Sequence, residues 1–496
     1  MSTEATPLIE NVESFLSEPR PLLIDGQWKT ARSGATFSTL DPATGEVFAT
    51  VADGGKPEID AAVASARRAF DGGWAQSAGA YRADLLNRLA DLIETHAEEF
   101  AQLDSLDCGK PISLARLADV PTAIGHFRYF SGWATKLSGE TIPVSAPGFL
   151  NYTVREPIGV VGLIIPWNFP VMFAAVKLAP ALCSGCTVVL KPAEQTPLSA
   201  LRLGELIQEA GFPDGVVNIV PGSGEIAGAA LAAHPGVDKI AFTGSTEVGR
   251  KIIAAAAGNL KKVSLELGGK APNIILPDAD LDTVADAAAD AIFFNQGEAC
   301  CAGTRLLVHE SCRRELVEEV IKRAAAIKVG PGLLPDTQMG PLVSEEQLAR
   351  VQGYLESGLS QGARIVTGGG RPAGLEGGYF LEPTVFEDVE ASMAIAQEEI
   401  FGPVLTVLGW SDLDDLVRKA NDTVYGLAAG IWTKDLSRAH NLAARMKAGT
   451  VWINCWNAFD PGSPWGGYRQ SGWGRETGRL GAEQYTEVKS VWVNLN

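Results

Sequence analysis

Short runs of β-branched residues alternate with longer stretches rich in alanine and leucine between residues 154 and 267. The short runs predict strands at 158–165, 187–191, 216–220, 239–242 and 263–267, and the stretches between them predict helices near 170–184, 198–211, 225–233 and 246–257. Strands and helices in strict alternation favour a parallel sheet that is covered on both faces. A second alternating series runs from Asn273 to about residue 470. We therefore predict an α/β protein with two doubly wound parallel sheets.

Amphipathic and irregular segments flank these series. Apolar residues at helical spacing predict two helices, one at 56–70 and one at 81–103. Residues 1–19 lack periodicity and predict a loosely held arm. Residues 485–494 carry alternating valines and predict a terminal strand, which needs a neighbouring edge that a partner subunit could supply.

The chain of 496 residues is too long for one hydrophobic core, because single cores stop growing at roughly 250–300 residues. The glycine-rich segment at 267–270 interrupts the alternation and marks a domain boundary. The predicted organisation is an arm at 1–19, a dinucleotide-binding domain at 20–135 and 158–267, a catalytic domain at 268–478, and small oligomerisation strands at 136–157 and 479–496.

Composition and charge narrow the functional classes. The formal charge is -18, with 59 acidic and 41 basic residues, which gives no electrostatic support for binding nucleic acid. The most apolar region, 158–190, contains prolines, an asparagine and a lysine, so it does not predict a membrane span. The N-terminus lacks the basic start of a secretory signal. Seven cysteines, an odd number spread over the chain, indicate reduced thiols and a cytoplasmic location.

Two glycine-containing turns are candidates for binding phosphate. Gly222-Ser-Gly224-Glu-Ile-Ala-Gly228 resembles the dinucleotide fingerprint, but its third glycine comes one place late. Phe242-Thr-Gly244-Ser245-Thr-Glu-Val-Gly249 links a strand end to a helix start, where free amides suit a phosphate. Taken alone, this second segment is equally consistent with an ordinary strand-to-helix turn.

Three side chains are candidates for chemistry. Cys300 follows a polar, glycine-containing approach that suits an exposed turn, although a vicinal cysteine pair is more often buried and inert. Glu266 stands at a predicted strand end beside paired glycines. Partial burial there would raise the pKa of its carboxylate and let it act as a base. The alternative is a solvated glutamate at the end of the strand. Asn168 follows a buried strand and offers an amide donor to an oxyanion. Cys183 and Cys186 have C-x-x-C spacing but apolar flanks, and we interpret them as structural thiols. No metal site is predicted.

Seven segments together resemble the aldehyde dehydrogenase superfamily, in that family's order. They are I-P-W-N-F-P, K-P-A-E-Q-T-P, F-T-G-S-T-E-V-G, L-E-L-G-G-K, N-Q-G-E-A-C, Q-E-E-I-F-G-P-V and P-W-G-G-Y-R-Q-S-G-W-G-R-E. The resemblance extends from Leu22 to the terminal strand and implies a soluble NAD-dependent enzyme, with NADP possible, that acts on a small aldehyde. It also implies a homo-oligomer, a tetramer in preference to a dimer.

The resemblance assigns roles residue by residue. Cys300 matches the nucleophile, Glu266 the general base and Asn168 the oxyanion donor, while Lys177 and Glu476 match residues that assist proton transfer. The cofactor surface it implies consists of Ile165, Trp167, Lys191, Glu194, Gly224, Gly244, Ser245, Gly249, Leu267, Glu399 and Phe401. Glu194 favours NAD, because a carboxylate accepts from ribose hydroxyls and repels a 2′-phosphate. Glu298 stands where the family motif usually has glutamine.

The same resemblance implies a substrate tunnel lined by Phe169, Met172, Phe173, Val176, Phe294, Trp456, Asn457, Phe459 and Trp465. An apolar lining favours an apolar or aromatic aldehyde. The N-terminal S-F-L-S-E-P-R-P-L-L-I-D-G-Q-W is similar to the opening of phenylacetaldehyde dehydrogenases, so phenylacetaldehyde is the expected substrate. The alternatives are a betaine or amino-aldehyde dehydrogenase, a coenzyme-A-acylating relative, and a structural relative without activity. Val176 weakens the betaine alternative, and retention of Glu266 weakens the coenzyme-A alternative.

Overall fold

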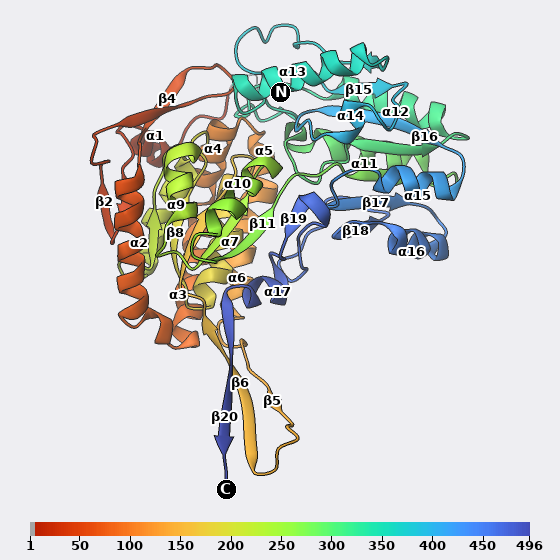
Figure 1. Cartoon of the computed structure of the whole chain (residues 1–496). Coiled ribbons are helices and arrows are strands. Elements are labelled where there is room, and N and C mark those ends of the chain that lie inside the picture. The colour runs from red at the N-terminus through yellow and green to blue at the C-terminus, as the bar shows by residue number, and fades with distance from the viewer. Residues whose placement is uncertain (1–4) are drawn as a thin grey trace.

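The first sheet gathers strands from both ends of the described chain. The computed structural model describes residues 5–496, and the sheet order is β19-β11-β10-β7-β8-β9-β1-β2 (Figure 1). Its strands are β1 (Leu22–Ile24), β2 (Gln27–Lys29), β7 (Val160–Ile164), β8 (Thr187–Lys191), β9 (Val217–Ile219), β10 (Lys239–Thr243), β11 (Lys262–Glu266) and β19 (Gly472–Trp473). β7 to β11 are mutually parallel, whereas β1, β2 and β19 add antiparallel edges. The predicted parallel sheet is therefore confirmed as the centre of a mixed one.

Helices cover both faces of this sheet because alternate side chains of a strand point to opposite sides. In β7, Val161 and Leu163 join one apolar core, while Val160 and Ile164 join another. The helices of this half are α2 (Lys56–Asp71), α3 (Gly79–Thr95), α4 (Ala97–Cys108), α5 (Ile112–Leu114), α6 (Val120–Ser131), α7 (Pro170–Cys183), α8 (Leu198–Ala210), α9 (Ala229–Ala233) and α10 (Thr246–Ala256), with the short turns η1 (Trp74–Gln76), η2 (Ala115–Asp119) and η3 (Gly224–Gly228).

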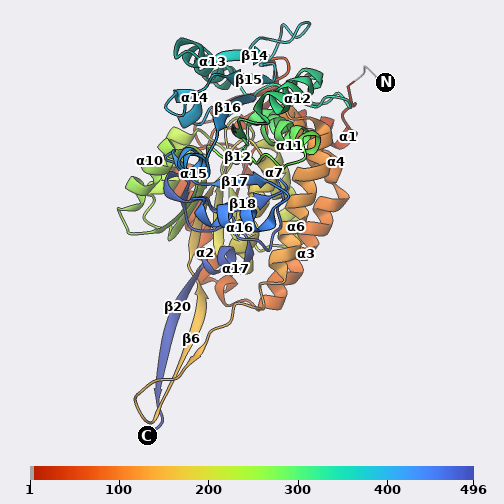
Figure 2. The same cartoon turned by 90° about the vertical axis from the view of Figure 1, so that its right-hand side faces the viewer.

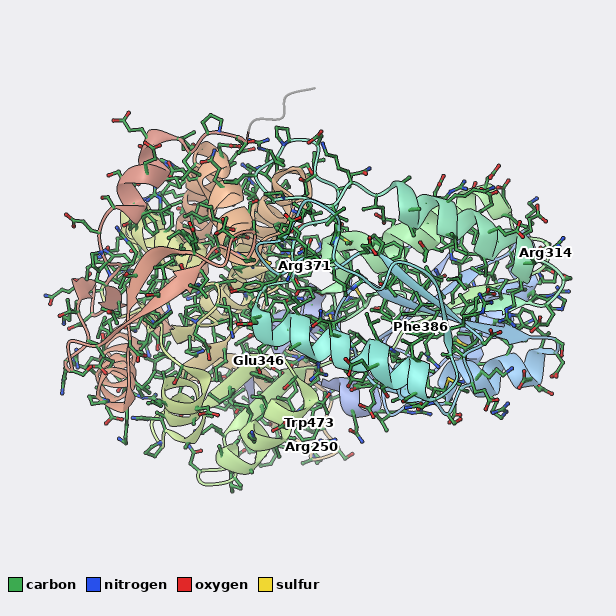
Figure 3. The ribbon with its side chains drawn as sticks, turned by 90° about the horizontal axis from the view of Figure 1, so that it is seen from above. Arg250, Arg314, Glu346, Arg371, Phe386 and Trp473 are labelled. Atoms are coloured by element: carbon green, nitrogen blue, oxygen red, sulfur yellow. The ribbon has the colours of Figure 1, made fainter. Side chains whose placement is uncertain are left out.

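The second sheet has the order β14-β15-β16-β13-β12-β17-β18 and is parallel except for β14. Its strands are β12 (Pro272–Ile275), β13 (Arg305–His309), β14 (Arg364–Thr367), β15 (Thr384–Glu387), β16 (Val404–Trp410), β17 (Ala428–Trp432) and β18 (Thr450–Ile453). Its helices are α11 (Leu281–Phe293), α12 (Arg313–Ala326), α13 (Glu345–Ser360), α14 (Ala394–Gln397), α15 (Leu413–Asn421) and α16 (Leu436–Arg445). Figure 3 shows Phe386 inside this half beside α13, and a Cβ atom on Gly358 would lie 3.0 Å from its ring. Helix and sheet therefore meet closely there.

A three-stranded antiparallel arm projects from the body and carries the C-terminus (Figure 2). It consists of β5 (Thr141–Ile142), β6 (Phe149–Pro157) and β20 (Thr486–Asn494), and helix α17 (Gly478–Glu483) leads into β20. β20 pairs along its whole length with β6 of the same chain. The expected terminal strand is present, but this chain supplies one of its neighbours and leaves its outer edge without a strand in the described residues.

Two sequence expectations are wrong in detail. The segment 10–16, placed in a loose arm, forms helix α1 (Glu10–Leu16), because Val12 and Phe15 are buried in the main core. The single helix predicted at 81–103 is two helices that meet at His96, whose φ of -103° and ψ of 23° are not helical. A separate hairpin of β3 (Thr36–Leu40) and β4 (Val47–Ala52) was not predicted. No helix among residues 5–496 is long and apolar enough to cross a membrane.

Candidate active site

Cys300 lies in a contorted turn after helix α11. The intervening turn η4 (Phe294–Gly297) holds Asn295 and Gln296 at φ values of 49° and 57°, which side-chain-bearing residues rarely adopt. Gly297 is also left-handed, and a Cβ atom there would lie 2.2 Å from the carbonyl oxygen of Gly402. These conformations direct the chain back toward the sheet ends and leave the Cys300 side chain half-buried in a cavity wall.

Two adjacent glycines after β11, Gly268 and Gly269, let the turn that carries Cys300 pack closely against the end of this strand. A Cβ atom on Gly269 would lie 2.3 Å from the Cys300 carbonyl oxygen, and one on Gly268 would lie 2.2 Å from a carboxylate oxygen of Glu399. The glycines of L-E-L-G-G-K are therefore needed for close packing. They bring Cys300, Glu266 and Glu399 into one region.

Glu266 ends strand β11 as a buried acid without a hydrogen-bond partner. Its side chain is 3% exposed, and neither carboxylate oxygen is paired among the described residues. Burial raises the pKa of Glu266 well above its ordinary value, the nearby Glu476 raises it further, and Lys177 and Arg475 oppose the shift. A carboxylate whose pKa is raised in this way is a stronger base than an exposed one.

Asn168 is held at the N-terminal side of helix α7. Its side-chain amide donates to the Glu298 backbone carbonyl oxygen over 2.8 Å. The backbone carbonyl oxygen of Asn168 accepts from Lys110 Nζ over 2.9 Å. An amide NH₂ group has two hydrogens, so one remains for another acceptor. Neither the sequence motifs nor the spacing pointed to Lys110.

Lys177 and Glu476 form a buried ion pair across helix α7 and the segment before α17. One Glu476 oxygen accepts from Lys177 Nζ, while the other has no partner in the described residues. Because Glu476 and Lys177 both act on the pKa of Glu266, the pair is coupled to the predicted base.

The surroundings of the Cys300 thiol differ from those expected of an activated nucleophile. The neighbouring Cys301 thiol raises the pKa of Cys300 well above its usual value, and burial and the carboxylates of Glu399 and Glu266 add to the effect. A thiolate-stabilising cation is not among these influences. A neighbouring base is therefore required to take the thiol proton.

A cavity of about 510 Å³ opens beside Cys300. It contains the predicted lining residues Phe169, Met172, Phe173, Val176, Phe294, Asn457, Phe459 and Trp465. Trp456 is different, because it does not line this cavity and packs instead over Gly430 and Gly303. Sequence reasoning missed the polar lining residues Asp119, Thr122, His126, Thr450, Asp460, Ser463 and Thr477, which lie on segments that carry no motif.

Lys191, Glu194 and Gly224 lie together at the ends of β8 and β9. Lys191 Nζ donates to Glu194 over 2.9 Å, and the other oxygen of Glu194 accepts from the Gly224 amide over 3.1 Å. The Glu194 side chain remains 38% exposed, so it can still meet a hydroxyl group of a ligand. This arrangement suits a ribose and disfavours a second phosphate there.

Helix α10 begins at an N-terminus that suits a phosphate. Ser245 caps it, with its hydroxyl accepting from the Val248 amide over 3.2 Å. A Cβ atom on Gly249 would lie 2.8 Å from the Leu267 side chain, and one on Gly244 would lie 2.5 Å from the Phe242 ring. Both glycines therefore permit close packing around the helix start, and exposed Ile226 and Val248 add apolar surface that sequence reasoning missed.

The remaining predicted cofactor residues follow β7, β11 and α14 in the chain. Glu399 is half-buried, and its removal from solvent raises its pKa to about 7, while it accepts from the Gly269 amide over 2.9 Å. Phe401, in a left-handed conformation with φ 61°, packs edge-on against Trp167 at 5.2 Å between ring centroids. Ile165 is buried at the end of β7 and donates from its amide to the Lys191 carbonyl oxygen.

Glu298, which stands where the family motif usually has glutamine, is a buried acid. Its carboxylate is buried and accepts from the Val343 amide over 3.0 Å, and burial raises its pKa well above the usual value. Its other carboxylate oxygen accepts from the Gln296 side-chain amide over 3.4 Å, so both oxygens of Glu298 serve as acceptors.

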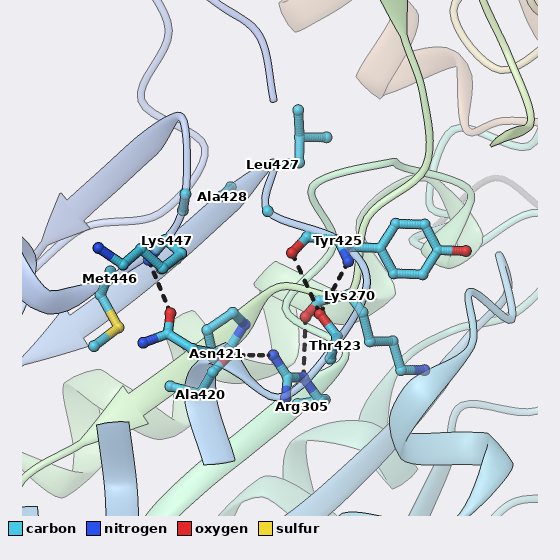
Figure 4. Close-up of a pocket in the computed structure, with 14 residues that line it drawn as sticks. Lys270, Arg305, Ala420, Asn421, Thr423, Tyr425, Leu427, Ala428, Met446 and Lys447 are labelled. Atoms are coloured by element: carbon cyan, nitrogen blue, oxygen red, sulfur yellow. Dashed lines mark hydrogen bonds between the residues drawn. The ribbon is translucent and has the colours of Figure 1, made fainter. Parts of the chain in front are cut away.

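Other candidate sites carry no catalytic features. The thiols of Cys183 and Cys186 are fully buried and donate to the carbonyl oxygens of Pro180 and Tyr485, as structural thiols do. A smaller cavity beside β12 and β17 is lined by Arg305, whose guanidinium donates to the carbonyl oxygens of Lys270, Lys419 and Ala420 (Figure 4). No cluster of three potential metal ligands occurs within residues 5–496.

Comparison with known proteins identifies relatives along the whole chain. A model of the aldehyde dehydrogenase family matches residues 28–491. The human mitochondrial aldehyde dehydrogenase is 50% identical over 498 residues, which cover 100% of this chain and 95% of that protein. An aldehyde dehydrogenase from Bacillus cereus, solved as its NAD+ complex, has a TM-score of 0.98 and 49% identity, covering 99% of this chain and 100% of the other. Betaine aldehyde dehydrogenase from Staphylococcus aureus, solved with NAD+, has a TM-score of 0.96 and 40% identity, covering 99% and 98%.

Proposed function

The chain belongs to the aldehyde dehydrogenase family, and we propose that it oxidises an aldehyde to the carboxylic acid with NAD+. The observation that carries this proposal is that Cys300 lines an apolar cavity while Glu266 and Asn168 are held close to Cys300. Gly269 packs against the Cys300 carbonyl, and the Asn168 amide bonds to Glu298, two residues before Cys300. A structural protein without activity would have no need of an unpaired buried carboxylate there.

The cofactor surface fits NAD+. Glu194 would accept from the adenosine ribose, the start of helix α10 at Ser245 would bind the pyrophosphate, and Glu399 would accept from the nicotinamide ribose. The buried, unpaired oxygens of Glu266 lie close enough to Cys300 to raise the pKa of its thiol, as Glu399 also does. Bound there, NAD+ supplies the hydride acceptor that the side chains of the chain lack.

Cys300 begins the proposed reaction. Its thiol proton passes to a neighbouring base, its sulfur bonds to the aldehyde carbon, and the carbonyl oxygen becomes an oxyanion. The free N–H of Asn168 and the Cys300 backbone amide stabilise that oxyanion. Loss of hydride from the same carbon restores the carbonyl group and leaves a thioester on Cys300.

Glu266 then releases the product. Its carboxylate takes a proton from a water molecule whose oxygen attacks the thioester carbon, and the collapse returns the thiolate and frees the acid. Lys177 and Glu476 would carry the proton away from Glu266. Hydrolysis needs this base, whereas transfer to coenzyme A does not, so we favour the hydrolytic route.

An apolar or aromatic aldehyde such as phenylacetaldehyde is the proposed substrate class. Phe169, Phe173 and Phe294 give the cavity aromatic walls, and the Phe169 and Phe294 rings stack at 6.1 Å. Trp465 and Phe459 at the cavity keep an amino-aldehyde as the second candidate, because aromatic faces also attract cations.

We also propose the division of the chain at residue 267 and a homo-oligomer, preferably a tetramer. Phe149, Leu150, Val488 and Trp492 are exposed on the arm, which favours its burial against another subunit. Sedimentation of the purified protein measures the assembly state directly.

The test is an NADH-release screen of aliphatic, aromatic and amino aldehydes with NAD+ and with NADP+. Cys300→Ser is expected to abolish NADH formation while retaining NAD+ binding, whereas the adjacent control Cys301→Ser retains turnover. Strict dependence on coenzyme A would overturn the hydrolytic route, and undiminished turnover by Cys300→Ser would overturn the assignment.

A further inference from the structure

His126, a residue of the cavity wall beside Cys300, has an unpaired ring nitrogen. The residue lies on helix α6 and lines that cavity, yet its side chain is 5% exposed. Its Nδ1 atom is 2.8 Å from the Thr122 carbonyl oxygen, which can only accept, so Nδ1 carries the hydrogen. The other ring nitrogen, Nε2, has no partner among the described residues.

The charge state of this ring follows from its surroundings. Burial lowers the pKa of His126, whereas the bond to Thr122 and the charge of Asp460 oppose the shift. A neutral imidazole with its hydrogen on Nδ1 has a lone pair on Nε2. Because an unpaired buried acceptor costs free energy, a donor inside the cavity would stabilise this arrangement.

A second acceptor lies over the same face of helix α6. Pro461 is 3.7 Å from a Cβ atom built on Gly125, and Tyr129 is 3.3 Å from one built on Gly462. The loop 460–462 therefore packs across the helix on both sides of His126. Asp460 belongs to that loop, lines the cavity and places a carboxylate near the ring.

The rest of the cavity wall restricts the kind of substrate group that can carry the hydrogen-bond donor. Phe169, Phe173 and Phe294 are aromatic and Val176 is aliphatic, so the space between the thiol and His126 favours an apolar group. A carboxylate at the far end of a substrate would meet the lone pair of His126 and the negative charge of Asp460. The cavity therefore combines the Cys300 thiol and apolar walls with the acceptors of His126 and Asp460.

We propose that His126 and Asp460 form a subsite that accepts a hydrogen bond from a hydroxyl group on the aldehyde, so that hydroxyaryl aldehydes are preferred substrates. This inference rests on the proposed aldehyde oxidation and specifies its substrate class. The hydroxyl hydrogen points to His126 Nε2, the ring stacks between the phenylalanines, and the aldehyde carbon faces Cys300.

The experiment compares kcat/KM for 4-hydroxyphenylacetaldehyde, phenylacetaldehyde and 4-carboxyphenylacetaldehyde, with NADH formation as the readout. The wild-type protein is expected to prefer the hydroxyl compound over phenylacetaldehyde roughly tenfold, the effect of one hydrogen bond. His126→Phe is expected to bring this ratio close to one, while His126→Gln retains part of it because its amide oxygen can accept. The control His309→Phe alters a histidine that packs edge-on against Trp410 outside the cavity and leaves the ratio unchanged.

Asp460→Ala provides a second variant, because this exposed side chain can be removed without disturbing the core. A fall in the same ratio supports the subsite even if His126→Phe does not fold. A wild-type ratio near one, a ratio unchanged in both variants, or a preference for the carboxylate compound overturns the subsite alone. Absence of NADH formation from every aldehyde overturns the proposed function and the subsite together.

Discussion

Lys110→Met should both destabilise the protein and loosen Asn168. The Lys110 side chain is fully buried, and its Nζ atom donates to the Asp119 carboxylate and to the Asn168 carbonyl oxygen over 2.9 Å. It also lies 4.2 Å above the centre of the Phe169 ring. One cation therefore connects a buried acid to the loop that carries the predicted oxyanion donor.

The expected loss of stability follows from the Asp119 carboxylate, which keeps its charge but loses its cation. Removing one partner of a buried ion pair costs about 3–5 kcal/mol, because the other charge remains without compensation. Here burial already raises the pKa of Asp104 to about 7 and raises that of Asp119, and the charge of Lys110 opposes both shifts. At pH values between the unfolded pKa of 3.8 and the raised folded pKa, the native state binds more protons than the unfolded state. Stability therefore falls as pH rises through this window, and the deficit of the variant is larger at pH 8 than at pH 5.

Urea denaturation at both pH values measures this loss. Lys110→Met/Asp119→Asn should recover most of the stability at pH 8, because the stranded carboxylate is gone, but its kcat should stay low because Asn168 still lacks the lysine. A free energy of unfolding for Lys110→Met within about 1 kcal/mol of the wild-type value at pH 8 would refute the reasoning, since breaking a buried ion pair costs more than that. Equal stability of the single and double variants would also refute it.

Three further substitutions test separate features. Gly269→Ala should lower kcat roughly a hundredfold, because its Cβ atom would lie 2.3 Å from the Cys300 carbonyl oxygen and displace the nucleophile. Glu194→Gln should improve kcat/KM for NADP+ relative to NAD+ roughly tenfold, because the carboxylate that repels a 2′-phosphate is removed. Lys270→Met should raise the free energy of unfolding by about 1–3 kcal/mol, because a buried ammonium without a partner is removed. Burial lowers the pKa of Lys270 to about 7, so the wild-type penalty is complete below pH 7 and fades toward pH 10.5.

Controls or contrary results distinguish the expected effects of these three variants. Gly353→Ala adds a methyl group where nothing lies within 4 Å and should leave kcat unchanged, whereas equal effects at both glycines would show that close packing is irrelevant. Glu225→Gln removes a neighbouring charge from the helix start at η3 and should not alter the cofactor ratio as Glu194→Gln does. A gain for Lys270→Met that is as large at pH 10 as at pH 6 would contradict the assigned penalty.

The sequence predicts most of the sheet because strand patterns are local. β8 coincides with the predicted run 187–191, and β7 and β10 differ from prediction by one or two residues at an end. The break at His96 was not predictable from periodicity, since apolar spacing continues across it. Helix α1 was missed because two buried apolar residues in seven make a weak pattern.

The candidate site was predictable where a motif carries the chemistry and not where distant segments meet. Glu266 and Cys300 are both in motifs, and the glycines between them explain their approach. Lys110 reaches Asn168 across 58 positions, and the 460–462 loop meets His126 only in the folded chain. Trp456 stands in a segment that lines the cavity, but its ring turns to cover Gly430, a choice set by local packing.

The central claim is that Cys300 holds the acyl group and Glu266 lets water remove it. The most direct measurement is a rapid-quench experiment on Glu266→Gln with NAD+ and an aromatic aldehyde, followed by mass spectrometry of the peptide that contains Cys300. We expect a burst of about one NADH per site, the acyl mass on Cys300 and almost no steady-state turnover. Steady turnover at the wild-type rate, or a burst with the acyl mass on another residue, would contradict the account.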